Sequence, residues 1–472
     1  MKMGLLQCPL SCYSQNQQQQ TQSHSHDHHL NSESSTSSSL SSQPSLPSVP
    51  SLTSQPSQQS HSHDHHLNSE SSTSSSLSSQ PSLPSVPSLT SQPSQQSQTT
   101  HHQLLTTIKG HNSPIFSLTL HSKFLYSASS NSEIRRFNKD PFALEASNNT
   151  NNKLVAISNK STIKSIIILN DMLFSAHQDH KIRVWKIETK TKNSTTNDQD
   201  PQSLFKCIAT LPTFNDRFSK IFSSKNYVEV RRHKKCTWVN HIDTVSSLAV
   251  SKDESLIYSA SWDRTFKIWR VSDFKCLESV KNAHEDAINS IVVSSDGVVY
   301  TGSADKKIKI WKKNHNHNEI EKSEKKHFLI GTLEKHRSAV NALALNKNGS
   351  ILYSGACDRS ILVWEKSDDE KMVLVGALRG HTKAILCLVV NDDLVCSGSA
   401  DNSVRIWRRG IDEKNYSCLG VLQGHRKPVK CLAMAANDSK SKSDDDNCNS
   451  YLVYSGSLDC DIKVWKIQVP LF

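Results

Sequence analysis

The sequence predicts an all-β protein, in which residues 101–472 form a ring of seven four-stranded sheets after a disordered tail over residues 1–100. The two parts differ in composition: the first is mostly Ser, Gln, His and Pro, whereas the second holds nearly all the apolar and charged residues. One sequence frame recurs seven times in the second part. The runs between its fixed positions alternate and are β-branched, as in Val245–Val250, which is typical of strands.

The tail contains an exact duplication, because residues 23–59 recur unchanged as residues 60–96. A Ser/Gln/Pro-rich segment buries too little apolar surface to offset the entropy of an ordered chain, so we expect residues 1–100 to be disordered. Each copy holds four His around an Asp, but no scaffold fixes their geometry. We therefore expect no metal site there.

The repeated frame has three fixed positions. A Ser or Thr stands four residues before an Asp or Asn, and an aromatic residue stands six after it. The central positions are Asn131, Asp179, Asp263, Asp305, Asp358, Asp401 and Asp459. Upstream, a His is followed four residues later by Ile or Val in six copies. The steps from Asp263 to Asp305 and from Asp358 to Asp401 are 42 and 43 residues, the period of a four-stranded blade.

This frame resembles the WD40-repeat family over residues 104–467, and the Gly-His pair of that family appears at Gly110-His111, Gly380-His381 and Gly424-His425. In finer detail the chain is similar to the plant JINGUBANG-like proteins. The stretches that carry this similarity are residues 231–235, 258–269, 273–279 and 378–381. The resemblance implies a seven-bladed β-propeller and a plant regulatory protein that works in cytoplasm and nucleus, through a transcription regulator.

The resemblance also implies a buried hydrogen-bond chain in each blade, from Trp to Ser or Thr, to His, to Asp. The members would be His241, Ser259, Asp263, Trp269, His284, Thr301, Asp305, Trp311, His336, Ser354, Asp358, Trp364, His381, Ser397, Asp401, Trp407, His425, Ser455, Asp459 and Trp465. Blade 1 departs from the pattern with Asn131 and Phe137, and blade 2 with Asn159 in place of His. We expect blades 1 and 2 to be the least stable, since an incomplete buried network costs stability.

Two further expectations concern the connections. Residues 104–109 resemble the strand before Gly424-His425, and the chain stops soon after Trp465. We expect this N-terminal strand to supply the outer strand of the last blade and so close the ring. The gap between Asp179 and Asp263 spans two periods. We interpret residues 186–240 as a long insertion whose Phe218, Ile221 and Phe222 lie on a short helix packed against the ring.

The sequence contains no motif of a known catalytic or cofactor site, and the repeated His, Ser and Asp fit the structural network. We therefore expect no enzyme activity, no cofactor and no metal. The positions expected to be exposed on one face are the residue before each Asp and those one and three after each His. Since Trp and Arg often dominate binding energy, we predict a protein-binding face that includes Trp262, Ile242, Thr244, Arg337, Arg426 and Lys160.

Charge leaves alternatives open. The whole chain has a net charge of +11 and the tail has a net charge of −3, so residues 101–472 have a net charge of +14. Binding of nucleic acid or an anionic surface is one alternative, and a substrate receptor of a ubiquitin ligase is another. The chain lacks the interleaved aromatics of the first and the Trp-Asp-x-Arg blade ends of the second. We expect a monomer that binds proteins, with no membrane association. The run Arg231, Arg232, Lys234 and Lys235 fits a solvated loop, a nuclear import signal or an acidic-partner patch.

Overall fold

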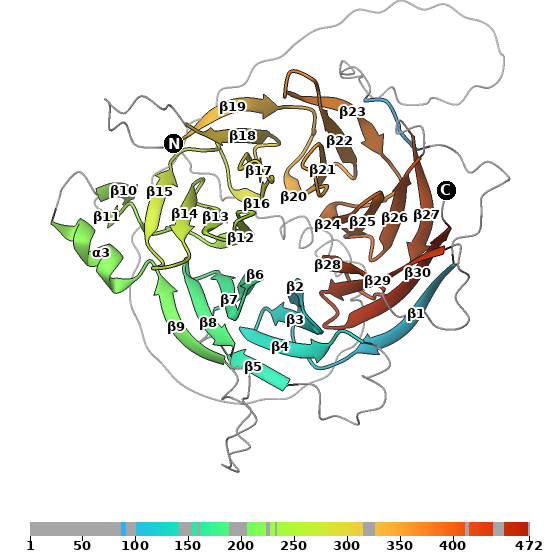
Figure 1. Cartoon of the computed structure of the whole chain (residues 1–472), viewed down its shortest axis with the longest axis horizontal. Coiled ribbons are helices and arrows are strands. Elements are labelled where there is room, and N and C mark those ends of the chain that lie inside the picture. The colour runs from blue at the N-terminus through green and yellow to red at the C-terminus, as the bar shows by residue number, and fades with distance from the viewer. Residues whose placement is uncertain are drawn as a thin grey trace, which may run out of the picture. The chain divides into compact units, whose positions relative to one another are not determined.

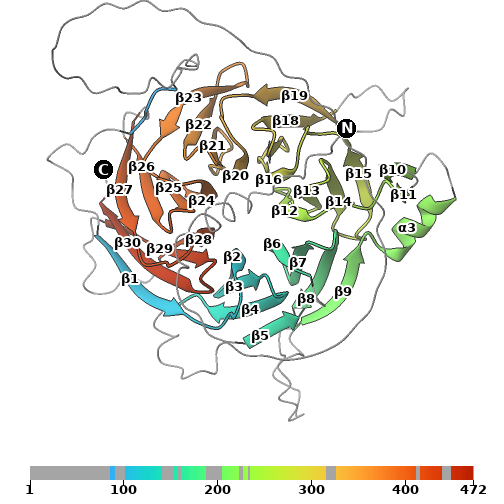
Figure 2. The ribbon, with the colours of Figure 1, turned by 180° about the vertical axis from the view of Figure 1, so that it is seen from behind.

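The computed structural model describes residues 86–90, 101–140, 153–157, 161–187, 205–222, 227–231, 234–314, 326–410, 415–437 and 448–470. Within these ranges, seven four-stranded antiparallel sheets stand around a central axis like the blades of a propeller (Figures 1 and 2). One short helix and one separate hairpin accompany them. The seven-bladed β-propeller predicted from the repeated frame is confirmed.

The strands are counted outwards from the centre in each blade. Blade 1 holds β2 (Ile115–His121), β3 (Phe124–Ser129), β4 (Glu133–Asn138) and β5 (Lys153–Ile157). Blade 2 holds β6 (Ile163–Leu169), β7 (Met172–His177), β8 (Ile182–Ile187) and β9 (Phe205–Leu211). Blade 3 holds β12 (Val245–Val250), β13 (Leu256–Ser261), β14 (Phe266–Arg270) and β15 (Cys276–Val280). Blade 4 holds β16 (Ile288–Val293), β17 (Val299–Ser303), β18 (Ile308–Lys313) and β19 (His327–Leu333).

The second half of the ring repeats this plan. Blade 5 holds β20 (Val340–Leu345), β21 (Ile351–Ala356), β22 (Ile361–Lys366) and β23 (Met372–Leu378). Blade 6 holds β24 (Ile385–Asn391), β25 (Leu394–Ser399), β26 (Val404–Arg409) and β27 (Tyr416–Leu422). Blade 7 holds β28 (Val429–Ala436), β29 (Cys448–Ser457), β30 (Ile462–Pro470) and β1 (His101–Ile108). The hairpin of β10 (Tyr227–Arg231) and β11 (Lys234–Thr237) stands apart from the blades.

Blade 7 contains both ends of the ring. Strand β1 pairs antiparallel with β30, so that Leu104 lies opposite Trp465 and Ile108 opposite Ile462. The first strand of the ring and its last three strands therefore share one sheet, and the edge of β30 is paired.

The hydrophobic core is divided into layers between neighbouring blades. One cluster packs Val245 and Leu248 of blade 3 against Phe174 and Val184 of blade 2, and Trp269 belongs to it as well. Each blade thus has a neighbouring blade against each of its two faces. This burial on both faces explains the near-continuous apolar runs of the middle strands. The β-branched sequence of each run suits this pleated and buried setting.

The insertion is shorter than predicted. Strand β9, inside the expected range of 186–240, is the outer strand of blade 2, so the added structure begins after Leu211. It consists of α3 (Phe214–Ile221) and the β10–β11 hairpin. The basic run lies at the turn of this hairpin, where residues 232 and 233 lie outside the described ranges.

The predicted packing of the insertion helix is wrong in its contact face. Two of the three side chains expected to pack, Phe218 and Phe222, are 50% and 78% exposed, and Phe214 is 70% exposed. The side chain of Ile221 lies outside the described residues. The contact is polar instead: the buried Asp216 accepts the backbone N–H of Cys276, in blade 3, at 2.8 Å through Oδ2. The aromatic spacing predicted the helix but not the side that faces the protein.

The predicted tail boundary at residue 100 is also wrong for one short segment. Residues 86–90, drawn in blue beside β23 and β27 in Figure 1, lie against the ring, and Leu89 is buried. The apolar Val86 and Leu89 explain the difference, because a Ser/Pro-rich segment orders where it buries such side chains. The predicted disorder of residues 1–85 and 91–100 lies outside the described residues.

Candidate binding site at the centre of the ring

The hydrogen-bond chain implied by the resemblance is present in blades 3–7. In blade 3, Trp269 Nε1 donates to Ser259 Oγ at 2.8 Å, and the hydroxyl meets His241 Nε2 at 2.8 Å. His241 Nδ1 lies 3.0 Å from Asp263 Oδ2. A carboxylate only accepts, so Nδ1 carries the ring proton and Nε2 accepts from Ser259. In blades 4–7 the matching distances are 2.8–3.0 Å.

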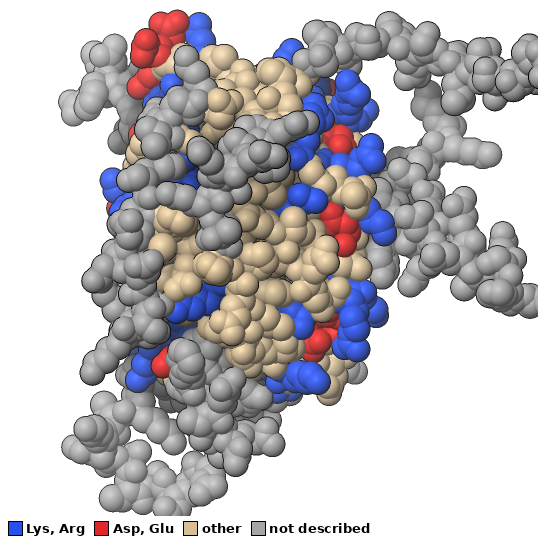
Figure 3. All heavy atoms as spheres, turned by 90° about the vertical axis from the view of Figure 1, so that its right-hand side faces the viewer, with Lys and Arg blue, Asp and Glu red and all other residues tan. Residues whose placement is uncertain are grey.

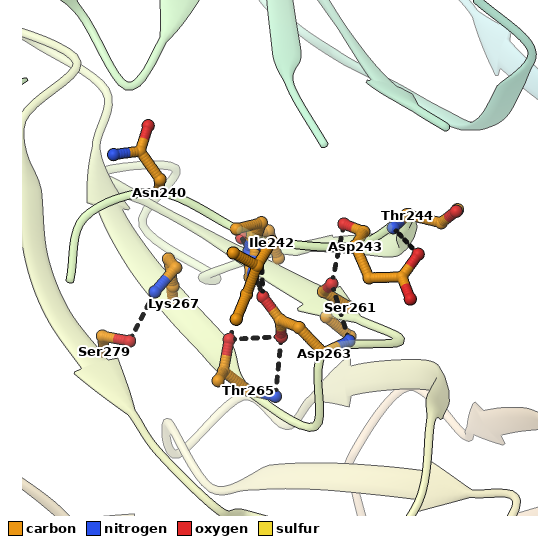
Figure 4. Close-up of polar contacts among 12 residues, drawn as sticks. Asn240, Ile242, Asp243, Thr244, Ser261, Asp263, Thr265, Lys267 and Ser279 are labelled. Atoms are coloured by element: carbon orange, nitrogen blue, oxygen red, sulfur yellow. Dashed lines mark hydrogen bonds and ion pairs between the residues drawn. The ribbon is translucent and has the colours of Figure 1, made fainter. Parts of the chain in front are cut away.

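Asp263 forms hydrogen bonds to the loops at one end of blade 3 (Figure 4). Its carboxylate accepts the backbone N–H groups of Ile242 and Thr265, both at 2.9 Å, and the Thr265 hydroxyl at 2.6 Å. Burial alone would raise the pKa of Asp263, but the charge and hydrogen bond of His241 hold that pKa below its usual range. The side chains of this hydrogen-bond chain are buried and bond to one another, which indicates a structural role rather than a reactive site.

Blade 1 lacks two members of the chain. His111 Nε2 meets Ser127 Oγ at 2.6 Å, but its Nδ1 has no hydrogen-bond partner among the described residues. The carboxylate of Glu133 lies 3.7 Å away, beyond hydrogen-bond distance, and receives Arg135. Burial, together with the charge of Arg135, lowers the pKa of His111 to about 3. Phe137 stands where the other blades have Trp, so this chain ends at Ser127.

Blade 2 replaces its missing histidine from another position. Asn159 lies outside the described residues, but His177 Nε2 meets Ser175 Oγ at 2.7 Å, and Trp185 Nε1 donates to that oxygen at 2.8 Å. Burial is the main cause that lowers the pKa of His177 to about 4. The expected low stability stays a prediction for blades 1 and 2, and blade 2 has a substitute network.

Each inner strand carries a β-bulge at its second residue, where the pairing with the next strand slips by one. The bulged residues are Phe116, Lys164, Ser246, Asn289, Asn341, Leu386 and Lys430, one from each blade. All seven line a cavity of about 270 Å³ at the centre of the ring. A bulge re-aims a side chain, and here it directs one residue per blade into this central cavity.

Three of the bulged residues bind the next blade. Ser246 Oγ donates to the Ile288 carbonyl at 2.5 Å, Asn289 Nδ2 to the Val340 carbonyl at 3.0 Å, and Asn341 Nδ2 to the Ile385 carbonyl at 2.8 Å. In each case the acceptor is the first residue of the neighbouring inner strand. Blades 3, 4 and 5 thus use this position to hold the ring together.

The other four bulged residues come from blades 6, 7, 1 and 2, which follow one another around the ring. In that order they are Leu386, Lys430, Phe116 and Lys164, so apolar and basic side chains alternate. Trp262 of blade 3 continues the row, and Lys164 Nζ lies 4.6 Å from the Phe116 ring centroid and 5.4 Å from that of Trp262. We call these five residues the central arc. None of the described residues that line the cavity is acidic.

The binding residues predicted from the sequence are only partly brought together. Trp262 is half-buried in the central arc. Ile242 lines a different cavity, of about 480 Å³, between blades 2 and 3, and Arg337 and Arg426 are exposed but do not line the central cavity. The predicted exposure of Thr244 is wrong, since it is 2% exposed beneath the turn that holds Trp262.

Lys160 lies outside the described residues. The sequence reasoning missed Phe116, Lys164, Leu386 and Lys430. A signal for them exists, because each directly follows the Ile or Val that stands four residues after the frame position of His. Nothing in the sequence shows that this residue is bulged, and a regular strand would have pointed it elsewhere.

Three other features, namely metal clusters, disulfides and membrane-spanning helices, are absent from the described ranges of the structure. No group of three or more His, Cys, Asp or Glu side chains in these ranges could hold a metal ion. The ten described cysteines are free thiols. No described helix is both long enough and apolar enough to cross a membrane.

A family model of the WD domain, G-beta repeat (WD40), matches residues 233–270, 274–312, 328–365, 372–408 and 416–466. Among curated relatives, the probable cytosolic iron-sulfur protein assembly protein 1 of Scheffersomyces stipitis is 26% identical over 250 residues, covering 49% of this chain and 69% of that protein. Protein HIRA of Dictyostelium discoideum is 27% identical over 142 residues, covering 27% of this chain and 13% of that protein.

The Arabidopsis thaliana protein ROOT INITIATION DEFECTIVE 3 is 28% identical over 169 residues, covering 32% of this chain and 35% of that protein. Each matched repeat covers the first two strands of one of blades 3–7 and its third strand as far as the Trp, and in these blades the hydrogen-bond chain is complete. Five repeats of this chain thus match the WD40 family model, and they lie in a ring of seven blades.

Proposed function

We propose that this protein is a non-catalytic scaffold that binds partner proteins at the central arc. The partner would present an acidic segment with an apolar side chain. The observation that carries this proposal is the position of the Lys164 ammonium group between the rings of Phe116 and Trp262. Such a group pairs with a carboxylate while the rings receive an apolar side chain, and aromatic residues of this kind often dominate binding energy.

The charge of the cavity supports the same partner. Lys164 and Lys430 line it, and no acidic residue is among its described lining residues. On the side of the ring seen in Figure 3, the visible Lys and Arg lie among Asp and Glu and form no continuous basic surface. A mixed surface does not favour the nucleic-acid alternative, which needs a basic track.

The finer role rests on the similarity to plant JINGUBANG-like proteins. We propose regulatory signalling in a plant, in cytoplasm and nucleus, with a transcription regulator as partner. The Arabidopsis protein named for root initiation is a WD40 relative from a plant, which supports this setting. The basic run at the β10–β11 turn would serve as the nuclear import signal.

The test compares variants of the tagged full chain in their capture of proteins from cytoplasmic and nuclear plant extracts, read by mass spectrometry. Phe116→Ser/Trp262→Ser should lose its main partners by at least tenfold, because each side chain contributes on the order of 1–2 kcal/mol to an interface. Lys164→Glu/Lys430→Glu should lose the same partners.

The matched controls make the same kinds of substitution at residues that lie away from the central cavity. Leu277→Ser/Phe328→Ser removes two exposed apolar side chains from outer strands, and Lys252→Glu/Lys335→Glu reverses two exposed lysines away from the cavity. Both should retain all partners. Equal capture by arc and control variants, at equal melting temperature, would remove the arc as the binding site. Partners without any transcription regulator would refute the finer role.

A further inference from the structure

The outer side of the ring carries an occupied peptide site between blades 5 and 6. Residues 86–90 pair with the free edge of β23, where Leu89 N–H donates to the Ala377 carbonyl at 3.0 Å and Ala377 N–H donates to the Pro87 carbonyl at 2.9 Å. The Tyr416 N–H, at the start of β27, donates to the Leu89 carbonyl at 2.9 Å. The segment therefore adds a short parallel strand to blade 5 and bridges it to blade 6.

The site is shaped for this segment. Leu89 is 8% exposed and packs with Tyr353, Trp407 and Tyr416 of the two blades. Beneath it lies Gly376, where a Cβ atom would stand 2.6 Å from Leu89 Cγ and 2.9 Å from the Pro87 carbonyl oxygen. Any side chain at Gly376 would thus displace the leucine. We call the pocket of Gly376, Ala377 and Tyr416 the side slot.

The junction between blades 3 and 4 shows what happens without a peptide. Glu278 occupies the place of Gly376, since each lies opposite the residue just before the blade Trp. The Glu278 carboxylate accepts the N–H of His327, the first residue of β19, at 2.8 Å. At the side slot, the first residue of β27 donates to Leu89 instead. The ring fills one junction with its own side chain and leaves the other to a peptide.

The peptide in the side slot has an exact duplicate in the chain. Residues 49–53 read Val-Pro-Ser-Leu-Thr, as do residues 86–90, because they belong to the repeated segment. The contacts of the slot are with the backbone and with Leu89, and both are the same in the two copies. We propose that the side slot is a binding site for Val-Pro-Ser-Leu-Thr peptides, and that both tail copies are its exchangeable ligands.

The lengths of the two connections set the balance between the copies. Residues 91–100 separate the near copy from β1, and residues 54–100 separate the far copy from it. Loop closure scales with the 3/2 power of length, so the far copy has an effective concentration roughly tenfold lower. The near copy should hold the slot in the wild type, and the far copy should replace it when the near copy fails. This inference does not depend on binding at the central arc.

The test uses the full chain and hydrogen exchange at the Ala377 and Tyr416 amides, which donate to the Pro87 and Leu89 carbonyls. Leu52→Asp should leave protection unchanged. Leu89→Asp should lower it by roughly tenfold, as the far copy takes over. Leu52→Asp/Leu89→Asp should lose it. If Leu89→Asp exchanges as fast as the double variant, the far copy is not a ligand; if the double variant stays protected, the slot does not bind the motif.

Two further measurements separate binding from folding. Gly376→Ala should remove protection of Tyr416, whereas Gly331→Ala, at the matching position of blade 4, should keep it, since a Cβ there meets Ile310 at an ordinary 3.4 Å. A synthetic peptide of residues 85–92 should restore protection in the double variant, and the same peptide with Leu→Asp should not. Protection retained by Gly376→Ala, or no rescue by the peptide, would overturn the proposal.

Discussion

His111 and His177 are two buried histidines that meet the same serine position of their blades. Each contacts a Ser hydroxyl within 2.7 Å through Nε2. The Nδ1 of His177 lies 3.3 Å from the Ser161 carbonyl oxygen, and the Nδ1 of His111 has no hydrogen-bond partner among the described residues. His177 stands two residues before Asp179, where blade 3 has the buried Ser261, so the spacing rule that found the other histidines passed over it. A histidine at a different sequence position can thus contact the blade serine, and the spacing of the repeat does not reveal it.

These histidines predict how stability depends on pH. Their folded pKa values, about 3 and about 4, lie below the ordinary 6.5, so the unfolded state binds more protons below pH 6.5. The free energy of unfolding should therefore fall as pH drops from 6.5 to about 4, by up to about 1.4 kcal/mol per pH unit for each group.

Thermal unfolding between pH 7.5 and 4.5 checks this. His111→Gln/His177→Gln should be less stable at pH 7.5 but lose less melting temperature on acidification than the wild type. The matched control is His180→Gln, since His180 is exposed near blade 2. Parallel curves for wild type and double variant would show that neither histidine is held neutral by burial.

At the scale of elements, α3 shows the limit of pattern reading. The aromatic spacing predicted a helix, and the structure has one over Phe214–Ile221. The pattern also predicted an apolar contact, yet the helix meets blade 3 through Asp216 and exposes its Phe side chains. Hydrophobic periodicity indicates a face, and whether a partner covers that face depends on tertiary structure.

The anchoring role of Asp216 is testable. Asp216→Ala leaves the buried N–H of Cys276 without its acceptor, which should cost about 1–3 kcal/mol of the free energy of unfolding. Phe218→Ser removes an exposed ring and should change it by less than about 0.5 kcal/mol. Chemical denaturation measures both. If Phe218→Ser lowers the free energy of unfolding more than Asp216→Ala does, the helix is held by apolar packing and not by Asp216.

At the scale of the whole molecule, the repeats made the ring predictable. Seven copies of one frame, two of whose steps are 42 and 43 residues, predicted the number of blades, and the family resemblance implied the buried network. The central arc was predicted only at Trp262, since a β-bulge has no clear mark in the sequence. The docking of Leu89 was missed because the tail composition indicated disorder over its full length, and only the surface of blades 5 and 6 explains the exception.

The most direct test of the account places a photo-crosslinking amino acid at position 262 of the full chain, with position 328 on outer strand β19 as the control. Irradiation in plant extract should join the position-262 variant to an acidic partner protein. Lys164→Glu in the same chain should abolish that product. Equal products at both positions, or a position-262 product that survives Lys164→Glu, would contradict binding at the central arc.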